Sequence, residues 1–124
     1  MKLDEAKILV SDDSILSRKQ LKDTIAQWGS PTFVEAANGQ EAIEKFKAEK
    51  PDLTFLDIVM PVLDGIGAVE GIIAEDSSAN IVIVSSVGTQ AQLKKAIEAG
   101  AKDFIQKPLN ADQLRSIIAI NFEI

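Results

Sequence analysis

Short apolar runs rich in β-branched residues recur along the chain at intervals of about two dozen residues. Between consecutive runs, the apolar residues follow the spacing of a helix instead. This alternation predicts the strands of a parallel sheet, each followed by a helix. The predicted strands are Lys7–Ser11, Thr32–Ala36, Leu53–Leu56, Ile81–Ser85 and Asp103–Gln106.

The predicted helices carry apolar stripes and recognisable end signals. In the first helix, Leu21, Ile25 and Trp28 stand at positions i, i+4 and i+7 and form one apolar face. Gly29 then marks its end. Gly100 ends the fourth helix, at a position where a left-handed backbone costs glycine little. Further helices are expected after Asn38-Gly39, Asp64-Gly65, Thr89 and Asn110.

The five βα units follow one another without a linker, so residues 1–124 are expected to form one domain. The central strands contain continuous apolar runs, Ile8-Leu9-Val10 and Ile81-Val82-Ile83-Val84. Strands of this kind are covered by helices on both faces of their sheet. We therefore predict a doubly wound α/β fold built on a five-stranded parallel sheet.

Composition narrows the chemistry that this fold can support. The chain has 124 residues, 46% of them hydrophobic, which is enough to bury a core without disulfides or a structural metal. It contains no Cys and no His. That absence excludes zinc binding through the usual ligands, thiol catalysis, imidazole acid–base catalysis and a role as phosphohistidine donor.

Charge and the N-terminal sequence limit the partners. With 13 Lys+Arg against 19 Asp+Glu, the formal net charge is −6. Nucleic acids and anionic membranes repel such a surface, so neither is expected as a direct partner, and a protein or a small molecule is. The first residues are partly acidic where a signal peptide needs an apolar run, and no apolar stretch reaches a membrane-spanning length. We expect a cytoplasmic protein.

Polar residues follow several of the predicted strands at the point where each strand ends. In an open α/β sheet, ligands bind outside these carboxyl ends, so the polar side chains are expected to converge there. The set comprises Asp12 and Asp13 after the first strand, Asp57 after the third, Ser85 and Ser86 at the end of the fourth, and Lys107 after the fifth.

Three converging carboxylates need a cation. Two carboxylates about 4 Å apart repel by about 4 kcal/mol at an effective dielectric constant near 20. With only hard oxygen ligands available, Mg²⁺ suits the cluster better than zinc or copper. An Asp beside Mg²⁺ and a Lys can attack a phosphoryl group, because both cations neutralise the oxygens that carry charge during transfer. The residues therefore predict an aspartyl-phosphate site.

The order and spacing of these residues resemble those of response-regulator receiver domains. The resemblance rests on Asp12-Asp13, Asp57-x-x-Met60-Pro61-x-x-Asp64-Gly65, Ser85 and Lys107-Pro108. It covers nearly the whole chain, and the segments SSVGTQ and AIEAGAKDFIQKP are especially similar to chemotaxis regulators of the CheY type. The resemblance implies a flavodoxin-like, CheY-like (βα)5 fold with the strand order of that group.

The resemblance also assigns roles to the site residues. It implies that Asp57 is phosphorylated by the phosphohistidine of a sensor histidine kinase. Asp13 and Asp57 would bind Mg²⁺ with the backbone carbonyl of Val59, and Asp12 would act largely through water. Lys107 would pair with the phosphoryl oxygens. The resemblance also implies a cis Lys107-Pro108 bond.

The resemblance further implies a switch. Ser85 would hydrogen-bond to the phosphoryl group, and Phe104 would turn inward when this serine moves. The ring stands on a strand, where aromatic residues usually pack in the core, and that simpler interpretation stays open for Phe104. Phosphorylation would thus change a surface that binds a downstream effector, such as a flagellar switch component, through a population shift.

Four positions depart from the family pattern. Ser11 stands where an apolar strand residue is usual, so its hydroxyl must find a partner or be exposed. Ser86 replaces a small residue beside the switch hydroxyl. Val59 and Val87 follow the acceptor and the switch serine by two positions and offer no polar group to orient a water. We therefore predict slow self-dephosphorylation.

We predict a stand-alone receiver that acts in chemotaxis, and other interpretations compete with it. Asp12-Asp13 with Ser14 could form an ordinary helix N-cap. The chain could also be the N-terminal receiver segment of a larger multidomain regulator. An aspartyl-phosphate phosphatase typically needs a second acid where Val59 stands. A flavin or nucleotide module is disfavoured because no Gly-rich phosphate loop follows any strand. We therefore predict a regulator that catalyses only its own phosphorylation and dephosphorylation, not an enzyme.

Overall fold

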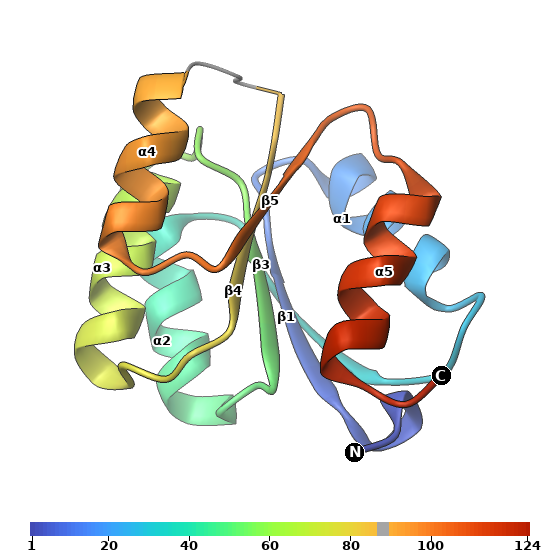
Figure 1. Ribbon diagram of the computed structural model, residues 1–124. Coiled ribbons are helices and arrows are strands. Elements are labelled where there is room, and N and C mark those ends of the chain that lie inside the picture. Colours follow the sequence, from blue (N-terminus) through green and yellow to red (C-terminus); the bar gives the residue numbers. More distant parts are fainter. Residues whose placement is uncertain (87–89) are drawn as a thin grey trace.

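The computed structural model, which describes residues 1–86 and 90–124, contains one parallel five-stranded sheet with helices on both of its faces (Figure 1). The strands are β1 (Lys7–Ser11), β2 (Thr32–Ala36), β3 (Leu53–Leu56), β4 (Ile81–Ser85) and β5 (Asp103–Gln106). The helices are α1 (Ile15–Ile25), α2 (Gly39–Glu49), α3 (Gly65–Glu75), α4 (Gln90–Ala99) and α5 (Ala111–Asn121). All five predicted strands are confirmed with their predicted bounds.

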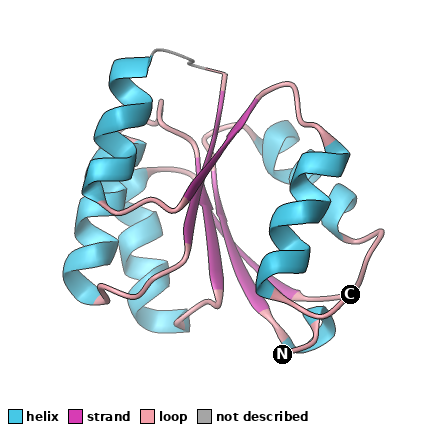
Figure 2. Cartoon of the chain, in the orientation of Figure 1, coloured by secondary structure: helices cyan, strands magenta, loops and turns pink. Residues whose placement is uncertain are grey.

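The strands follow the order β2-β1-β3-β4-β5, which is the flavodoxin-like order implied by the resemblance. β1 and β4 are buried along almost their whole length, whereas the edge strands β2 and β5 are partly exposed. In Figure 2 the sheet runs through the centre with helices on either side. The continuous apolar runs therefore mark the strands that are covered on both faces.

Two hydrophobic clusters lie on opposite faces of the sheet. The first joins residues of α1 and α5 to the sheet, with Phe55 and Ile8 among its fully buried members. The second joins α2, α3 and α4 to the other face, around Leu56 and Ile83. Neighbouring residues of one strand, such as Phe55 and Leu56, thus belong to different clusters, as the pleat of a strand requires.

Side chains cap α2, α3 and α5 at the positions that the sequence indicated. Asn38, Asp64 and Asn110 accept hydrogen bonds from backbone N–H groups in the first turns of α2, α3 and α5. α4 begins at Gln90, directly after Thr89, which lies outside the described residues together with Val87. Gly100 has a φ of 125°, as the prediction of a glycine-specific helix end required.

The first helix ends earlier than its apolar stripe suggests. α1 stops at Ile25, and Gln27 and Trp28 instead donate backbone hydrogen bonds to residues three positions earlier. Trp28 nevertheless packs against the first hydrophobic cluster. A tightened terminal turn keeps the side chain on the same face, so the apolar spacing continues where the α-helix does not.

The two termini lie at the end of the sheet opposite its carboxyl edge (Figure 1). A short 3-10 helix, Leu3–Glu5, precedes β1 and was not predicted from the sequence. An isolated bridge pairs Lys2 with Glu123. Among the described residues, no helix is long and apolar enough to cross a membrane.

Candidate functional site

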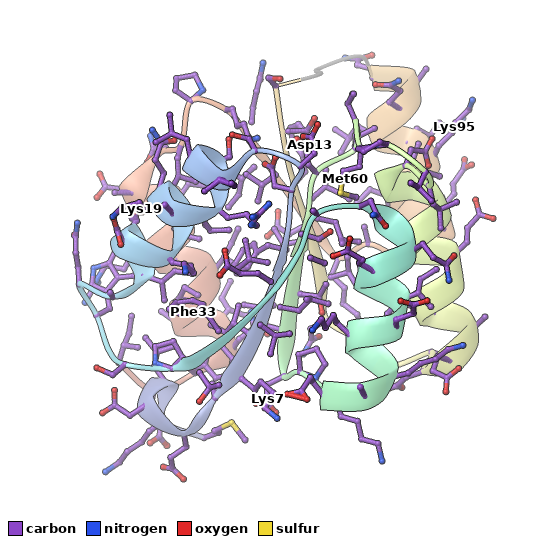
Figure 3. The ribbon with its side chains drawn as sticks, turned by 180° about the vertical axis from the view of Figure 1, so that it is seen from behind. Lys7, Asp13, Lys19, Phe33, Met60 and Lys95 are labelled. Carbon is purple, nitrogen blue, oxygen red and sulfur yellow. The ribbon has the colours of Figure 1, made fainter. Side chains whose placement is uncertain are left out.

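The three aspartates of the predicted site meet at the carboxyl edge of the sheet. Asp12 follows β1 and Asp57 follows β3, and these strands are neighbours, with Ser11 paired to Leu56. One carboxylate oxygen from each of Asp12, Asp13 and Asp57 lies within 4.8 Å of the others. Asp13 is at the carboxyl edge in Figure 3, far from Lys7 at the start of β1. The predicted convergence of the three aspartates is therefore confirmed.

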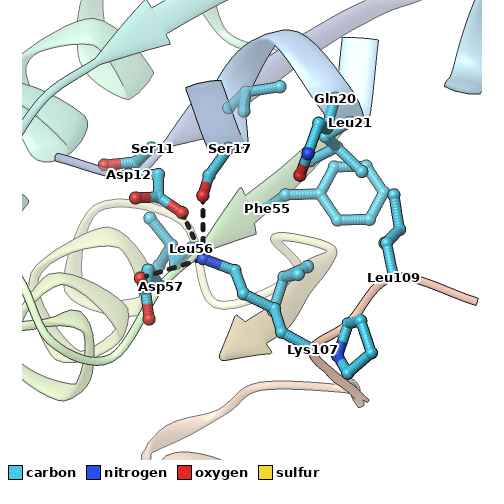
Figure 4. Close-up of a pocket in the computed structure, with 13 residues that line it drawn as sticks. Ser11, Asp12, Ser17, Gln20, Leu21, Phe55, Leu56, Asp57, Lys107 and Leu109 are labelled. Atoms are coloured by element: carbon cyan, nitrogen blue, oxygen red, sulfur yellow. Dashed lines mark hydrogen bonds and ion pairs between the residues drawn. The ribbon is translucent and has the colours of Figure 1, made fainter. Parts of the chain in front are cut away.

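Lys107 joins this cluster from the loop that follows β5. Its ammonium donates to Asp12 Oδ2 at 2.7 Å and to Asp57 Oδ2 at 3.3 Å. Figure 4 shows both contacts, and a third to the Ser17 hydroxyl at 3.4 Å. The Lys107-Pro108 peptide bond is cis, as the resemblance implied.

Burial and charge act in opposite directions on Lys107. Desolvation is the largest single influence and would lower its pKa. The hydrogen bond to Asp12, the negative charges of Asp57 and Asp12, and the hydrogen bond to Asp57 together outweigh that effect and raise the pKa above its ordinary value. Lys107 therefore stays charged at neutral pH and partly compensates the repulsion between the two buried carboxylates.

The backbone holds Asp12 and Asp57 in place. Asp12 N–H donates to the Ala36 carbonyl at 3.1 Å, and Asp57 N–H donates to the Ser11 carbonyl at 3.0 Å. Both aspartates are less than one-tenth exposed. Buried charged groups on fixed backbone need partners, and here the ammonium supplies one for each. The acids are thus held by the ends of the strands rather than by a mobile loop.

The interpretation of the acid pair as a helix cap is correct only in part. Ser14 is the N-cap of α1, and its hydroxyl accepts from Ser17 N–H at 3.2 Å. Asp12 Oδ1 accepts from Ser14 N–H at 2.9 Å, while its other oxygen binds Lys107. Asp13 is exposed and takes no part in the cap hydrogen bonds. The hydrogen bond from Ser14 therefore orients Asp12 through one carboxylate oxygen and leaves the other oxygen to bind Lys107.

The predicted switch residues lie on β4 and β5, which are neighbours in the sheet. Ser85 ends β4, is fully buried, and its carbonyl accepts from Lys107 N–H at 3.0 Å. Ser86 is exposed, so the two adjacent serines occupy different environments. Phe104 on β5 is half-buried and packs against the second hydrophobic cluster. This packing is what a core residue requires, and it leaves the predicted switch role untested.

The other positions that depart from the family pattern differ in their surroundings. Ser11 is buried, and its hydroxyl donates to the Asn38 carbonyl at 3.4 Å and contacts Met60 Sδ at 3.3 Å, so it has found partners. Val59 is 57% exposed, and its N–H donates to Asp57 Oδ1 at 3.4 Å. Val87 falls outside the described residues.

A cavity of about 90 Å³ opens beside Lys107 (Figure 4). Its polar end is formed by Asp12, Asp57 and Lys107, and Leu21 and Phe55 contribute to its apolar wall. The cavity therefore places apolar surface next to the charged cluster. Such surface lowers the local dielectric constant and strengthens the interactions of the ammonium.

Two residues that contact the site, Ser17 and Arg18, were not predicted from the sequence. Ser17 supplies the third contact of Lys107, and Arg18 Nη1 donates to the Asp12 carbonyl at 2.6 Å. Both stand in the first turn of α1, one helical turn beyond the acid pair. That position was the available signal, because a helix that starts at a site points its first-turn side chains back toward it.

The donor set fits a hard divalent cation. The cluster offers three carboxylates and no nitrogen or sulfur ligand, and oxygen atoms are the ligands that Mg²⁺ prefers. One ammonium cannot neutralise three carboxylates, so the described cluster keeps excess negative charge. A divalent cation would compensate that charge.

Comparison with known proteins agrees with this geometry. The response regulator receiver domain profile matches residues 8–119. The chain is 44% identical to the chemotaxis protein CheY of Thermotoga maritima over 108 residues, covering 87% of this chain and 90% of that one. It is 43% identical to Bacillus subtilis CheY over 112 residues, covering 90% and 93%.

A solved structure supports the same assignment. A chain of the CheX–CheY–BeF₃–Mg²⁺ complex from Borrelia burgdorferi superposes with a TM-score of 0.87 at 33% identity, covering 93% of this chain and 88% of that chain. Sequence, strand order and three-dimensional shape therefore agree. The chain belongs to the response regulator receiver domains and is CheY-like.

Proposed function

We propose that this CheY-like receiver accepts a phosphoryl group on Asp57 from the phosphohistidine of a sensor histidine kinase. The observation that carries the proposal is the Lys107 ammonium, which spans Asp12 at 2.7 Å and Asp57 at 3.3 Å beside the third carboxylate, Asp13. A buried carboxylate that lies beside an ammonium and beside two further acids able to hold a divalent cation is suited to phosphoryl transfer. Receiver domains mostly act as switches rather than as classical enzymes.

The proposed transfer uses a carboxylate oxygen of Asp57 as the nucleophile. A bond forms between this oxygen and phosphorus, the phosphorus–nitrogen bond of the donor breaks, and its electron pair returns to the imidazole nitrogen. The Lys107 ammonium lies close enough to Asp57 to pair with the phosphoryl oxygens. Its flexible side chain lets the charge move with them during transfer. Apolar Phe55 and Leu21 limit water on that side of the site.

Four residues would hold the metal. Asp13 and Asp57 would coordinate Mg²⁺ directly with the backbone carbonyl of Val59, and Asp12 would act largely through water. When bound, Mg²⁺ would supply positive charge to the phosphoryl oxygens. The support for this assignment is the clustering of the three carboxylates within 4.8 Å and the exposure of Asp13 toward solvent.

The phosphorylated form would act on other proteins. Ser85 would donate a hydrogen bond to the phosphoryl group, and Phe104 would carry the change to the surface of α4, β5 and α5. The identity of 43–44% to CheY proteins supports a role in chemotaxis, with a cytoplasmic effector such as a flagellar switch component. The net charge of −6 favours a protein partner over nucleic acid or membrane.

Intact-protein mass spectrometry tests the proposal directly. The folded protein is exposed briefly to acetyl phosphate with and without Mg²⁺, next to the variants Asp57→Asn and Asp64→Asn. Asp64 is a matched control, since it is an aspartate close in sequence that caps α3 and that asparagine can replace as a cap. We expect a single phosphoryl adduct that needs Mg²⁺, is lost in Asp57→Asn and remains in Asp64→Asn.

Two results would contradict the proposal. An adduct that survives in Asp57→Asn would move the phosphorylation to another residue. No adduct on the folded wild-type protein would leave an interaction module that works without phosphorylation as the better account.

A further inference from the structure

Arg18 contacts the acidic site from behind, through the backbone rather than through a carboxylate. Its Nη1 donates to the Asp12 carbonyl at 2.6 Å, and its Nε donates to Glu35 Oε1 at 3.0 Å. The Arg18 side chain is only 14% exposed. A planar guanidinium holds two acceptors in one fixed geometry, whereas the donors of an ammonium can rotate.

Glu35 on β2 ties this arginine to the sheet. Its other oxygen, Oε2, accepts from Lys22 at 3.1 Å, so the carboxylate lies between two cations of α1. Burial would raise the pKa of Glu35, but the hydrogen bonds and charges of Lys22 and Arg18 hold it below its ordinary value. Glu35 is therefore ionised at neutral pH and remains a partner for the guanidinium.

The Asp12 carbonyl belongs to the peptide group that leads into Asp13. The N–H of Asp12 is fixed by the Ala36 carbonyl at 3.1 Å, and its carbonyl is fixed by Arg18. The orientation of this peptide group sets the direction in which Asp13 leaves the backbone. Among residues 1–86 and 90–124, no hydrogen bond or ion pair holds the Asp13 carboxylate itself. Its place near Asp12 and Asp57 therefore depends on the backbone.

We propose that Arg18, held by Glu35, is a positioning residue for the cation site. It fixes the peptide group between Asp12 and Asp13 and so keeps the Asp13 carboxylate close to the other two acids. The inference rests on the proposed Mg²⁺ site and goes beyond it, because neither residue would touch the metal. Partners that orient ligands in this way typically change metal affinity by about tenfold or more when they are removed.

Calorimetric titration of the folded proteins with Mg²⁺ alone tests the proposal. Arg18→Ala is expected to weaken Mg²⁺ binding about tenfold, and Arg18→Lys to restore only part of that loss because an ammonium lacks the fixed, planar donor directions of a guanidinium. Lys22→Ala is the matched control: it removes the other cation bound to Glu35 but leaves the contact to Asp12 intact. We expect it to change Mg²⁺ affinity by less than about twofold.

A double-mutant cycle separates positioning from general destabilisation. If Arg18 acts through Asp13, then Arg18→Ala should change Mg²⁺ affinity by less than about twofold in an Asp13→Asn background. Equal losses in both backgrounds would overturn the proposal. Should Arg18→Ala fail to fold, Glu35→Gln provides the second variant, since it changes an exposed side chain and removes the ion pair that holds the arginine. We expect it to weaken Mg²⁺ binding severalfold, and an unchanged affinity would contradict the inference.

The wild-type titration distinguishes this inference from the proposed function. If the wild-type protein binds Mg²⁺ and takes up a phosphoryl group while Arg18→Ala and Glu35→Gln bind Mg²⁺ equally well, only the positioning role is wrong. If the wild-type protein binds no Mg²⁺, the cation site and the positioning role are both wrong.

Discussion

At the scale of single residues, Lys107 shows why the site uses a lysine. Its ammonium has three donors that can rotate among several acceptors, and three oxygens from Asp12, Asp57 and Ser17 lie at 2.7, 3.3 and 3.4 Å. An arginine would fix its donors in one plane and suit a static bridge, which is the role that Arg18 has on the other side of Asp12. The two cations thus differ in how rigidly their donors are oriented.

The ionised state of Glu35 predicts a pH dependence of stability. Because its pKa is lowered from the ordinary value of 4.5, its ion pairs stabilise the fold fully above that value. The stabilisation is lost as the pH falls through the lowered pKa of the folded state. We expect Glu35→Gln to have a lower free energy of unfolding than wild type near neutral pH. This difference should shrink below pH 4.5.

Urea unfolding at a series of pH values measures this difference. Glu44→Gln serves as the control, because Glu44 is exposed on α2 and forms no ion pair with the other described residues. A gap between Glu35→Gln and wild type that stays constant as the pH falls would show that the carboxylate charge does not matter.

Val59 predicts a long-lived phosphoryl group. Its side chain is 57% exposed and lies two residues beyond Asp57, yet it offers no atom that could orient a water. Val59→Asn would add a donor and an acceptor at this place. We expect it to accelerate loss of the phosphoryl group severalfold, with Val59→Ala close to wild type. The time course of the intact mass after removal of the phosphodonor measures both rates, and equal rates for Val59→Asn and wild type would remove Val59 as the cause.

At the scale of elements, the sequence was most informative where a strand is buried. The five strand bounds were predicted because continuous apolar runs such as Ile81-Val82-Ile83-Val84 end abruptly at polar residues. The end of α1 was not predicted, because Trp28 continues the apolar spacing into a tightened turn. The apolar spacing reports which side chains face the core. It does not report whether the backbone hydrogen bonds are those of an α-helix or of a tighter turn.

Only the part of the site that lies at the ends of strands was predictable from the sequence. The carboxyl edge brings together Asp12, Asp57 and Lys107, and the rule for open α/β sheets anticipates that. The roles of Ser17 and Arg18 depend on how α1 is rotated about its axis relative to β2 and β5. A single sequence does not specify that rotation, because nothing in it distinguishes a first-turn side chain that faces the site from one that faces solvent.

Gly65, the first residue of α3, lies against the backbone of Asp57. We therefore expect that one added methyl group at this position lowers the stability of the protein strongly. A Cβ at this position would lie 2.1 Å from the Asp57 backbone carbonyl, and the Gly65 N–H donates to the Ile58 carbonyl at 2.7 Å. Backbone atoms cannot yield as the end of a side chain can. We expect Gly65→Ala to lower the free energy of unfolding by about 2 kcal/mol or more.

Chemical denaturation compares this variant with Glu70→Ala on the exposed face of the same helix. That control should stay within about 0.5 kcal/mol of wild type. A Gly65→Ala protein as stable as the control would show that α3 can shift away from β3 at little cost.

At the scale of the whole molecule, one sheet connects the acidic site to a distant surface. Ser85 pairs with Gln106 across β4 and β5, and its carbonyl accepts from Lys107 N–H. Phe104 lies two residues before Gln106 and packs on the face covered by α2, α3 and α4. A movement of Ser85 would therefore pull on β5 at the same place where Lys107 is attached.

This connection predicts which of the two serines reports the state of Asp57. Beryllofluoride with Mg²⁺ would mimic the phosphoryl group, and amide NMR spectra would follow residues near Asp57 and residues of β5 and α5. In Ser85→Ala we expect the changes near Asp57 to persist and those in β5 and α5 to be largely lost. In Ser86→Ala we expect both sets to remain, because Ser86 is exposed whereas Ser85 is fully buried beside Lys107. The reverse pattern would assign the switch to Ser86, and distant changes that survive in both variants would mean that the sheet transmits the signal without either hydroxyl.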